Sequence, residues 1–139
     1  MRELARSTAL WRGLHRYLYV LMAQHASSAA CLRFHLISQR LARWLLMSQD
    51  RARSNSFHLT YEFLACMLGM RRVGITAAAS ALQRDGLIQY RRGEITVLDR
   101  SGLEAAACSC YASSEQTYND LLGSAVKACA SQKPPVYVR

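Results

Sequence analysis

Two pairs of arginines stand out as residues whose side chains could carry out recognition chemistry. Arg71-Arg72 follows Gly69 closely, and Arg91-Arg92 is followed at once by Gly93. The guanidinium group is a planar fork of N–H donors, which pairs with the oxygens of a phosphate or with the O6 and N7 edge of guanine. The elements around each pair must hold these side chains outward if they are to reach a polyanion.

The overall charge of the chain agrees with such a partner. Its 139 residues carry a formal net charge of +9, from 18 Lys+Arg against 9 Asp+Glu, and lysine occurs only at Lys127 and Lys133. This balance favours nucleic acid or an anionic membrane surface over an acidic small molecule. A hydrophobic content of 51% excludes wholesale disorder and suffices for one compact core.

The cysteines and the amino terminus indicate a reducing cytoplasmic setting. The five cysteines are odd in number and irregular in spacing: Cys31, Cys66, Cys108, Cys110 and Cys129. The charged residues of 1–12 interrupt any secretory signal, and no apolar run reaches the roughly 18 residues of a spanning helix. We therefore expect a cytoplasmic protein with no membrane segment.

The segment 60–84 has the spacing of a helix-turn-helix. Thr60 offers an N-cap for a short helix over 61–68, Gly69 ends it, and a second helix runs to about residue 84. Two helices that cross through a tight turn bring their backbones close, so the fifth residue of the first helix must be small, and Ala65 meets that need. Ile75 would fix the second helix onto the core.

The start of the second helix would then face outward and enter a major groove. The side chains expected to read base edges, an arginine on guanine and apolar groups on thymine methyls, are Arg72, Val73 and Ala77. Those expected to hold phosphate oxygens are Thr60, Arg71, Thr76, Arg91 and Arg92. Gly74 is unusual within a helix, and we expect it to keep this surface low so that the bases can approach.

Two alternating runs, 87–90 and 94–98, flank Arg91-Arg92-Gly93 and predict a β-hairpin. A hairpin after the second helix is a wing, whose tip would lie along the flanking phosphates. The alternative is that these arginines merely solvate the tip. The stretch 51–56 is expected to be a loop, with His58 in the connection before the helix-turn-helix, and Asp99 or Ser101 to cap a last helix through residues 103–107.

The amino-terminal segment predicts a long helix with a partial heptad seam. About 25 residues would form a rod of roughly 37 Å, too long to bury its stripe against so small a domain unless it pairs with a second copy. The residues expected to form this homodimer are Leu4, Trp11, Leu14, Leu18 and Leu21. The alternative is an amphipathic helix folded back on its own domain.

These elements predict a mainly α (α+β) fold, with a long dimerisation helix followed by a winged helix-turn-helix domain and a small β-hairpin wing. Residues 1–36 are expected to form the dimerisation helix, residues 37–110 the DNA-binding domain with a core helix over 37–50, and residues 111–139 a polar, loosely ordered tail.

Residues 31–110 resemble the carboxy-terminal DNA-binding region of Crp/Fnr-type bacterial transcription regulators, in the order and spacing of helix-turn-helix and wing. The helix before them resembles the dimerisation helix of that family. The resemblance implies a homodimer that regulates transcription at a near-palindromic site in double-stranded DNA, with RNA polymerase as a further partner. The family's amino-terminal β-roll sensor has no counterpart before this helix, so effector binding is not carried over. The family's Arg-Glu-Thr signature falls on Arg72, Val73 and Gly74, and only the arginine is retained.

Three other functions were weighed against DNA binding. An enzyme would need His58, Glu62 and Cys66 to act together, but no third group orients the pair on the helix, so no catalytic residue is assigned. Cys108-x-Cys110 with a histidine is a possible metal site, yet no second pair at zinc spacing follows, so no metal and no cofactor are assigned. The remaining alternative is a protein-interaction module, built on a winged helix that no longer binds DNA.

Overall fold

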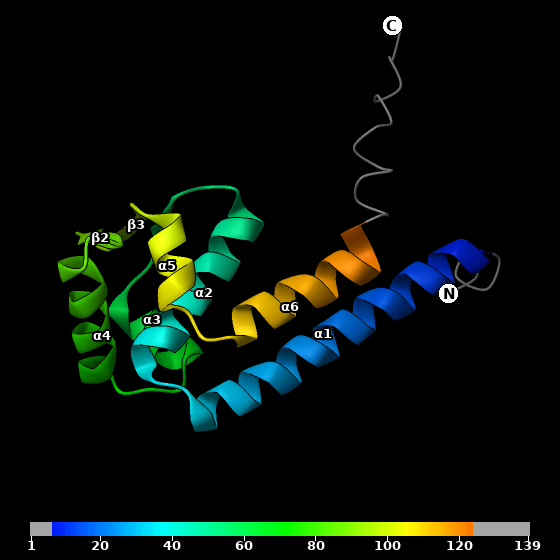
Figure 1. Ribbon diagram of the computed structural model, residues 1–139, viewed down its shortest axis with the longest axis horizontal. Helices are drawn as coiled ribbons and strands as arrows, with labels where there is room; N and C mark the ends of the chain where they lie inside the picture. The colour runs from blue at the N-terminus through cyan, green and yellow to red at the C-terminus, as the bar shows by residue number, and fades with distance from the viewer. Residues whose placement is uncertain (1–6, 124–139) are drawn as a thin grey trace, which may run out of the picture. The chain divides into compact units, whose positions relative to one another are not determined.

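The computed structural model of the chain describes residues 7–123 (Figure 1). The chain divides into two compact units. One is formed by residues 27–111, and the described parts of the other are residues 7–26 and 112–123. The mainly α fold with a small antiparallel sheet is confirmed.

The predicted long helix is present as α1 (Thr8–Phe34), which is 27 residues and therefore about 40 Å long. The Ser7 hydroxyl oxygen accepts a bond from the Leu10 N–H at 3.2 Å and so closes its first turn. Leu4 lies outside the described residues. None of the helices described over residues 7–123 has both the length and the sustained hydrophobicity that a membrane span requires.

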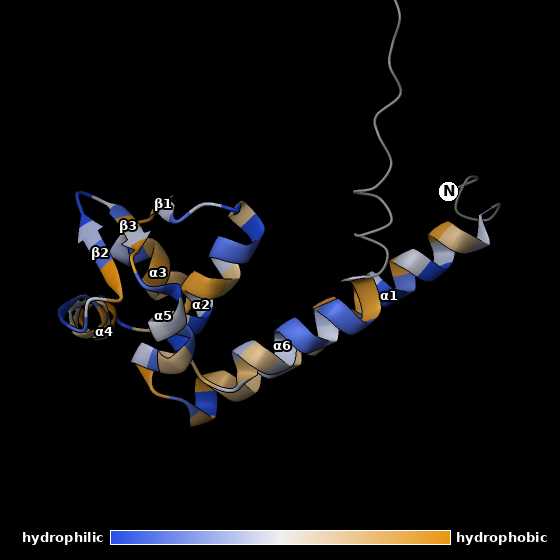
Figure 2. Ribbon diagram, turned by 45° about the horizontal axis from the view of Figure 1, so that its top comes forward, coloured by the Kyte–Doolittle hydropathy of each residue, from blue (hydrophilic) through white to orange (hydrophobic). Residues whose placement is uncertain are grey.

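The expected loose tail is wrong for residues 111–123, and the rest of that segment, 124–139, lies outside the described residues. Residues 110–123 form α6 (Cys110–Tyr118), continued by a π-helical turn, η1 (Asn119–Gly123). Both views show α6 running beside α1 (Figures 1 and 2). Within this unit, Val20 of α1 is 2% exposed and Ser114 of α6 is 7% exposed. The polar composition of the segment concealed a helix that needs only one narrow contact face.

The other unit is built on α2 (Ile37–Ala52), packed against α4 (Arg72–Arg84) and α5 (Arg100–Ala106). The predicted helix over 37–50 is therefore confirmed, and the short α3 (Tyr61–Met67) lies against α4. Hydrophobic stretches of α2, α3 and α4 gather where these helices meet (Figure 2). The fully buried large side chains of this core are Leu41, Leu45, Leu46, Leu64, Ile75, Ile88, Ile95 and Leu103.

The sheet has one strand more than the sequence predicted. The expected hairpin is β2 (Ile88–Arg91) with β3 (Glu94–Val97), and β1 (Ser56–His58) adds an antiparallel third strand in the order β1-β3-β2. His58 is thus in a strand, where we expected a loop. Ser56 pairs with Thr96 across the sheet, and their hydroxyl groups lie 2.9 Å apart. The serine-rich composition suggested a loop, but cross-strand partners decide the pairing of so short a strand.

Arg100 joins α2, α5 and the start of α6. Its guanidinium pairs with Asp50 at 2.9 Å and Glu104 at 2.8 Å, and donates to the Tyr111 hydroxyl at 2.8 Å. The Tyr111 hydroxyl donates in turn to Asp50 at 2.9 Å. Partial burial acts to lower the pKa of Arg100, but the hydrogen bond and charge of Asp50, together with the charges of Tyr111 and Glu104, raise that pKa overall. At the other end of α5, Asp99 is the N-cap, with its carboxylate accepting from Gly102 N–H at 3.0 Å.

Truncation of Leu103 tests whether α5 belongs to the main core. Leu103 is fully buried, so Leu103→Ala should lower the free energy of unfolding by about 2–5 kcal/mol through lost burial and a cavity. Leu98→Ala is the matched control, because Leu98 is 58% exposed and its truncation should change stability by less than about 0.5 kcal/mol. Urea titration followed by circular dichroism measures both, and equal losses would contradict the assignment of α5 to the core.

Candidate nucleic-acid interface

The turn between α3 and α4 has the geometry that the sequence predicted. The Thr60 hydroxyl oxygen accepts from the Phe63 N–H at 3.1 Å and caps α3, and Gly69 has a φ of +59°. Ala65 is buried at 8% exposure and its carbonyl accepts from Met70 N–H at 2.8 Å. Ile75 is fully buried in the core, so the register of α4 on the protein is fixed.

A buried arginine supports this turn from below. Arg40 of α2 is 5% exposed, and its guanidinium donates to the carbonyl of Leu68 and, at 3.2 Å, to the sulfur of Met70. A cation at the end of a helix satisfies free carbonyl groups and interacts favourably with the helix dipole. Arg40 therefore positions the turn from which α4 begins. The only sequence signal for this role was an arginine next to an apolar stripe.

The first turns of α4 present the expected side chains to solvent. Val73 is 80% exposed, an unusual position for a β-branched apolar residue, and Arg71, Arg72 and Ala77 are also exposed. No acidic residue occupies the first turn of α4, and its N-cap, Arg71, makes no side-chain capping bond. An anion near this end would meet the positive end of the helix dipole as well as the arginines.

Arg72 is already paired in the structure. Its Nη1 lies 3.1 Å from the Glu62 Oε1 of α3, and both side chains are well exposed, at 65% and 75%. An exposed ion pair of this kind contributes only about 0–1 kcal/mol. The Glu62 carboxylate can therefore orient the Arg72 fork and yet be exchanged for another acceptor at small cost.

Two hydroxyl groups assigned to phosphate have partners within the protein. The Thr76 hydroxyl donates to the Arg72 carbonyl at 3.0 Å, and the Thr60 oxygen accepts from the backbone of α3. Accepting leaves the proton of Thr60 free to donate outward, whereas Thr76 would have to rotate away from the helix.

Gly74 serves packing rather than access to bases. A Cβ built on this residue would lie 3.2 Å from the Cδ1 atom of Ile37, tighter than an ordinary contact. The expectation that Gly74 lowers the outer surface of α4 is therefore wrong, because the position faces α2. A glycine allows the start of α4 to approach α2 closely.

The wing turn carries the second arginine pair. Arg92 and Gly93 have φ values of +51° and +84°, as a two-residue hairpin turn requires, and Arg91 ends β2 opposite Glu94 of β3. A Cβ on Gly93 would lie 3.4 Å from the His58 ring, so β1 lies under the tip. Arg91 and Arg92 are exposed.

Two contacts join the wing to the helices. The Tyr61 and Tyr90 rings stack at 4.1 Å with an interplanar angle of 19°, and the Gln83 side-chain oxygen accepts from Tyr90 N–H at 3.0 Å. Partial burial, followed by the charge of Tyr90, raises the pKa of Tyr61, so its hydroxyl remains a donor near neutral pH. The wing is thereby attached to α3 and α4.

The residues weighed for catalysis have separate partners. His58 lies against Gly93, Glu62 pairs with Arg72, and Cys66 is exposed on α3. The contacts described for these three groups do not bring them together at one reaction centre.

Comparison with known proteins agrees with this geometry. Residues 39–106 match the Crp-like helix-turn-helix domain. A transcriptional regulator of the Crp/Fnr family from Eubacterium rectale is similar over 75% of this chain and 49% of its own, with 28% identity and a TM-score of 0.56. A CRP-family transcriptional regulator from Thermus thermophilus is similar over 68% of this chain and 49% of its own, with 25% identity and a TM-score of 0.57. Among proteins of curated function there is no significant match.

The similarity thus spans about half the length of each of these two regulators. The family match over residues 39–106 covers the helix-turn-helix, the wing and the buried Ile75. Residues 39–106 thus carry a Crp-like helix-turn-helix domain, and the chain is similar to transcription regulators of the Crp/Fnr family.

Proposed function

We propose that this chain binds double-stranded DNA as a homodimer at a near-palindromic site and regulates transcription in the cytoplasm. The observation that carries the proposal is the solvent-facing start of α4, where Arg72 and the 80% exposed Val73 lie on a helix that Ile75 fixes in register. The net charge of +9 supplies the long-range attraction that draws a polyanion to such a surface. Regulation would also involve RNA polymerase, which the family implies.

In this proposal α4 enters the major groove and reads bases. Arg72 exchanges Glu62 for the O6 and N7 atoms of a guanine, while Val73 and Ala77 contact thymine methyl groups. Arg71, Thr60 and Thr76 hold phosphate oxygens beside the groove, and Arg91 and Arg92 hold those under the wing. The side chains on the bases thus select the DNA sequence, and the side chains on the phosphates set the register of the protein on the duplex.

The homodimer would form along an apolar stripe of α1. Trp11 and Leu18 are 53% and 46% exposed, and Leu14 and Leu21 lie half-buried between them in the heptad register. Val20, the buried residue of this part of α1, is two positions from Leu18 and therefore about 160° away round the helix. The stripe thus faces away from the side that is already covered. Pairing two copies would place their α4 helices roughly 34 Å apart, on successive major grooves.

Replacement of Arg72 tests base readout. Arg72→Ala should lower affinity for the preferred site by about 1–3 kcal/mol and relax one base position, since a bidentate contact to guanine is lost. Arg84→Ala is the matched control, because Arg84 is exposed on the same helix at its far end. Selection from a randomised duplex library measures both, and an unchanged preference in Arg72→Ala would remove Arg72 from the readout.

Replacement of Arg92 tests phosphate contact by the wing. Arg92→Gly removes the guanidinium and keeps the turn, because glycine adopts the φ of +51° without strain. Binding should weaken alike for all sequences, and the slope of log K against log salt should fall by about 1. A protein-interaction module would show no steep dependence on salt and no effect of either arginine.

The charge of Glu62 offers an independent test of the Arg72 pair. Glu62→Gln should raise affinity for random DNA by roughly 1.5- to 5-fold and narrow the gap between specific and random sites, because a carboxylate near the phosphates is removed. Asp85→Asn, at the far end of α4, is the control for net charge. If both variants bind random DNA equally well, the effect belongs to total charge alone.

Leu18→Asp tests the dimer. A charge within the apolar stripe should shift the protein from dimer to monomer in sedimentation velocity, because burying an unpaired carboxylate there carries a large desolvation penalty. Tyr19→Asp is the control, since Tyr19 is 63% exposed and lies about 100° round the helix from Leu18. Equal mass for the wild type and Leu18→Asp would refute pairing through this stripe.

A further inference from the structure

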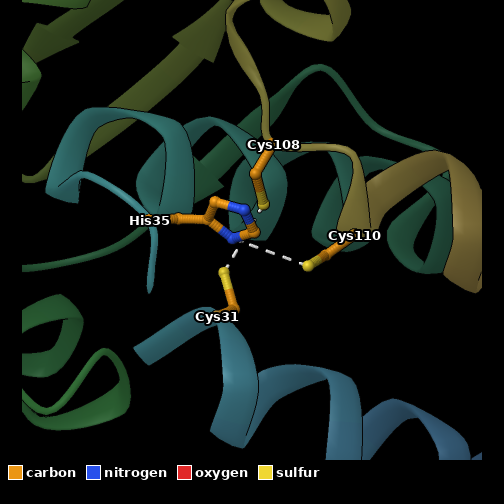
Figure 3. A group of neighbouring side chains, drawn as sticks. All are labelled: Cys31, His35, Cys108 and Cys110. Atoms are coloured by element: carbon orange, nitrogen blue, oxygen red, sulfur yellow. Dashed lines mark hydrogen bonds between the residues drawn. The ribbon is translucent and has the colours of Figure 1, made fainter. Parts of the chain in front are cut away.

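Three cysteines and a histidine lie together away from α4 and the wing. The four side chains are Cys31, His35, Cys108 and Cys110, and their ligand atoms all lie within 4.8 Å of one another. All four belong to the unit formed by residues 27–111. Figure 3 shows them converging from two segments, the end of α1 and the connection between α5 and α6.

The backbone holds these ligands in place. Cys31 and His35 are one helical turn apart, with the His35 N–H bonded to the Cys31 carbonyl at 3.2 Å. On the other segment, Tyr111 N–H donates to the Cys108 carbonyl at 2.9 Å, which closes the turn between Cys108 and Cys110. Tyr111 is itself 5% exposed and bonded to Arg100, so the second segment is anchored in the core.

The separations fit four ligands of one metal ion. The Cys31 and Cys108 sulfurs are 3.4 Å apart, and the Cys110 sulfur lies 3.6 Å from the His35 Nδ1 atom. Around Zn²⁺, tetrahedral bonds of about 2.3 Å to sulfur and 2.0 Å to nitrogen place neighbouring ligands about 3.8 Å and 3.5 Å apart. These two separations differ from the tetrahedral values by a few tenths of an ångström, and the other ligand pairs, all within 4.8 Å, would have to close by about 1 Å at most. The thiolates of a polynuclear iron–sulfur cluster bind different irons, and so need wider spacing than this set provides.

Burial also favours a metal over four unrelated side chains. Cys31 and Cys108 are 3% and 5% exposed, while His35 and Cys110 are half-buried. A disulfide between Cys31 and Cys108 would not explain why His35 and Cys110 lie beside them.

We propose that Cys31, His35, Cys108 and Cys110 bind one structural zinc ion. Each of the three thiols loses its proton to solvent on binding, and His35 binds as the neutral imidazole through Nδ1. Four protein ligands leave no open position for a substrate, so the ion is structural and not catalytic. It cross-links two segments separated by 77 residues and fastens the end of α1 to the segment that follows α5. This inference goes beyond DNA binding, and its test uses no DNA.

Metal content of the full chain tests the proposal. Protein purified under reducing conditions from zinc-supplemented cells should carry about one zinc ion per chain by mass spectrometry of the elements. Cys108→Ser should lower zinc affinity by more than about 100-fold, beyond the effect of losing a residue that only orients a ligand. Cys66→Ser is the matched control, because Cys66 is exposed on α3 and should leave the zinc content unchanged.

A measurement on the unaltered chain guards against a variant that simply fails to fold. X-ray absorption at the zinc edge should show about three sulfurs near 2.3 Å and one nitrogen near 2.0 Å, and cobalt in place of zinc should give the intense visible bands of a tetrahedral thiolate site. A chain without zinc, zinc held only by oxygen and nitrogen, zinc content equally low in Cys66→Ser, or a Cys31–Cys108 disulfide in the reduced preparation would each overturn the proposal.

Discussion

The close crossing of α3 and α4 is the constraint on which the outer surface of this domain depends. A crossing through so short a turn leaves room for only a small side chain at Ala65 and requires a positive φ at Gly69. Once these two conditions hold, the burial of Ile75 fixes the rotation of α4, and the exposed positions of its first turns follow. Val73 is exposed as a geometric consequence of this register.

The support for that crossing comes from within the protein and not from the helices alone. Arg40 places a positive charge on the free carbonyl of Leu68, and Gly74 allows the start of α4 to come close to Ile37 of α2. Burial of the Arg40 guanidinium costs desolvation free energy, and hydrogen bonds from its N–H donors are needed to offset that cost. The orientation of α4 is thus determined by α2 as well as by the turn.

Local rules were enough to predict the helix-turn-helix from the sequence. Thr60, Gly69 and Asp99 act through bonds or backbone angles within a few residues, and the structure shows each in the expected role. The third strand was missed because Ser56 gains its partner, Thr96, from a segment forty residues away. The thiol cluster was missed for the same reason, since Cys31 and His35 meet Cys108 and Cys110 only when the fold brings the two segments together. The role of Arg40 could not be predicted, because helical periodicity does not show that its guanidinium meets the carbonyl of Leu68.

In the proposed DNA complex, the pair between Arg72 and Glu62 would limit how strongly this surface binds DNA without regard to sequence. The Glu62 carboxylate beside Arg72 would repel any phosphate that passes near α3, and this repulsion would act on every sequence. Only an acceptor that matches the guanidinium fork offsets the loss of Glu62, and a guanine edge provides two such acceptors. A net charge of +9 already attracts polyanions strongly, whatever their sequence. If Arg72 reads a base as proposed, a single acidic residue beside it would raise selectivity more than it reduces affinity.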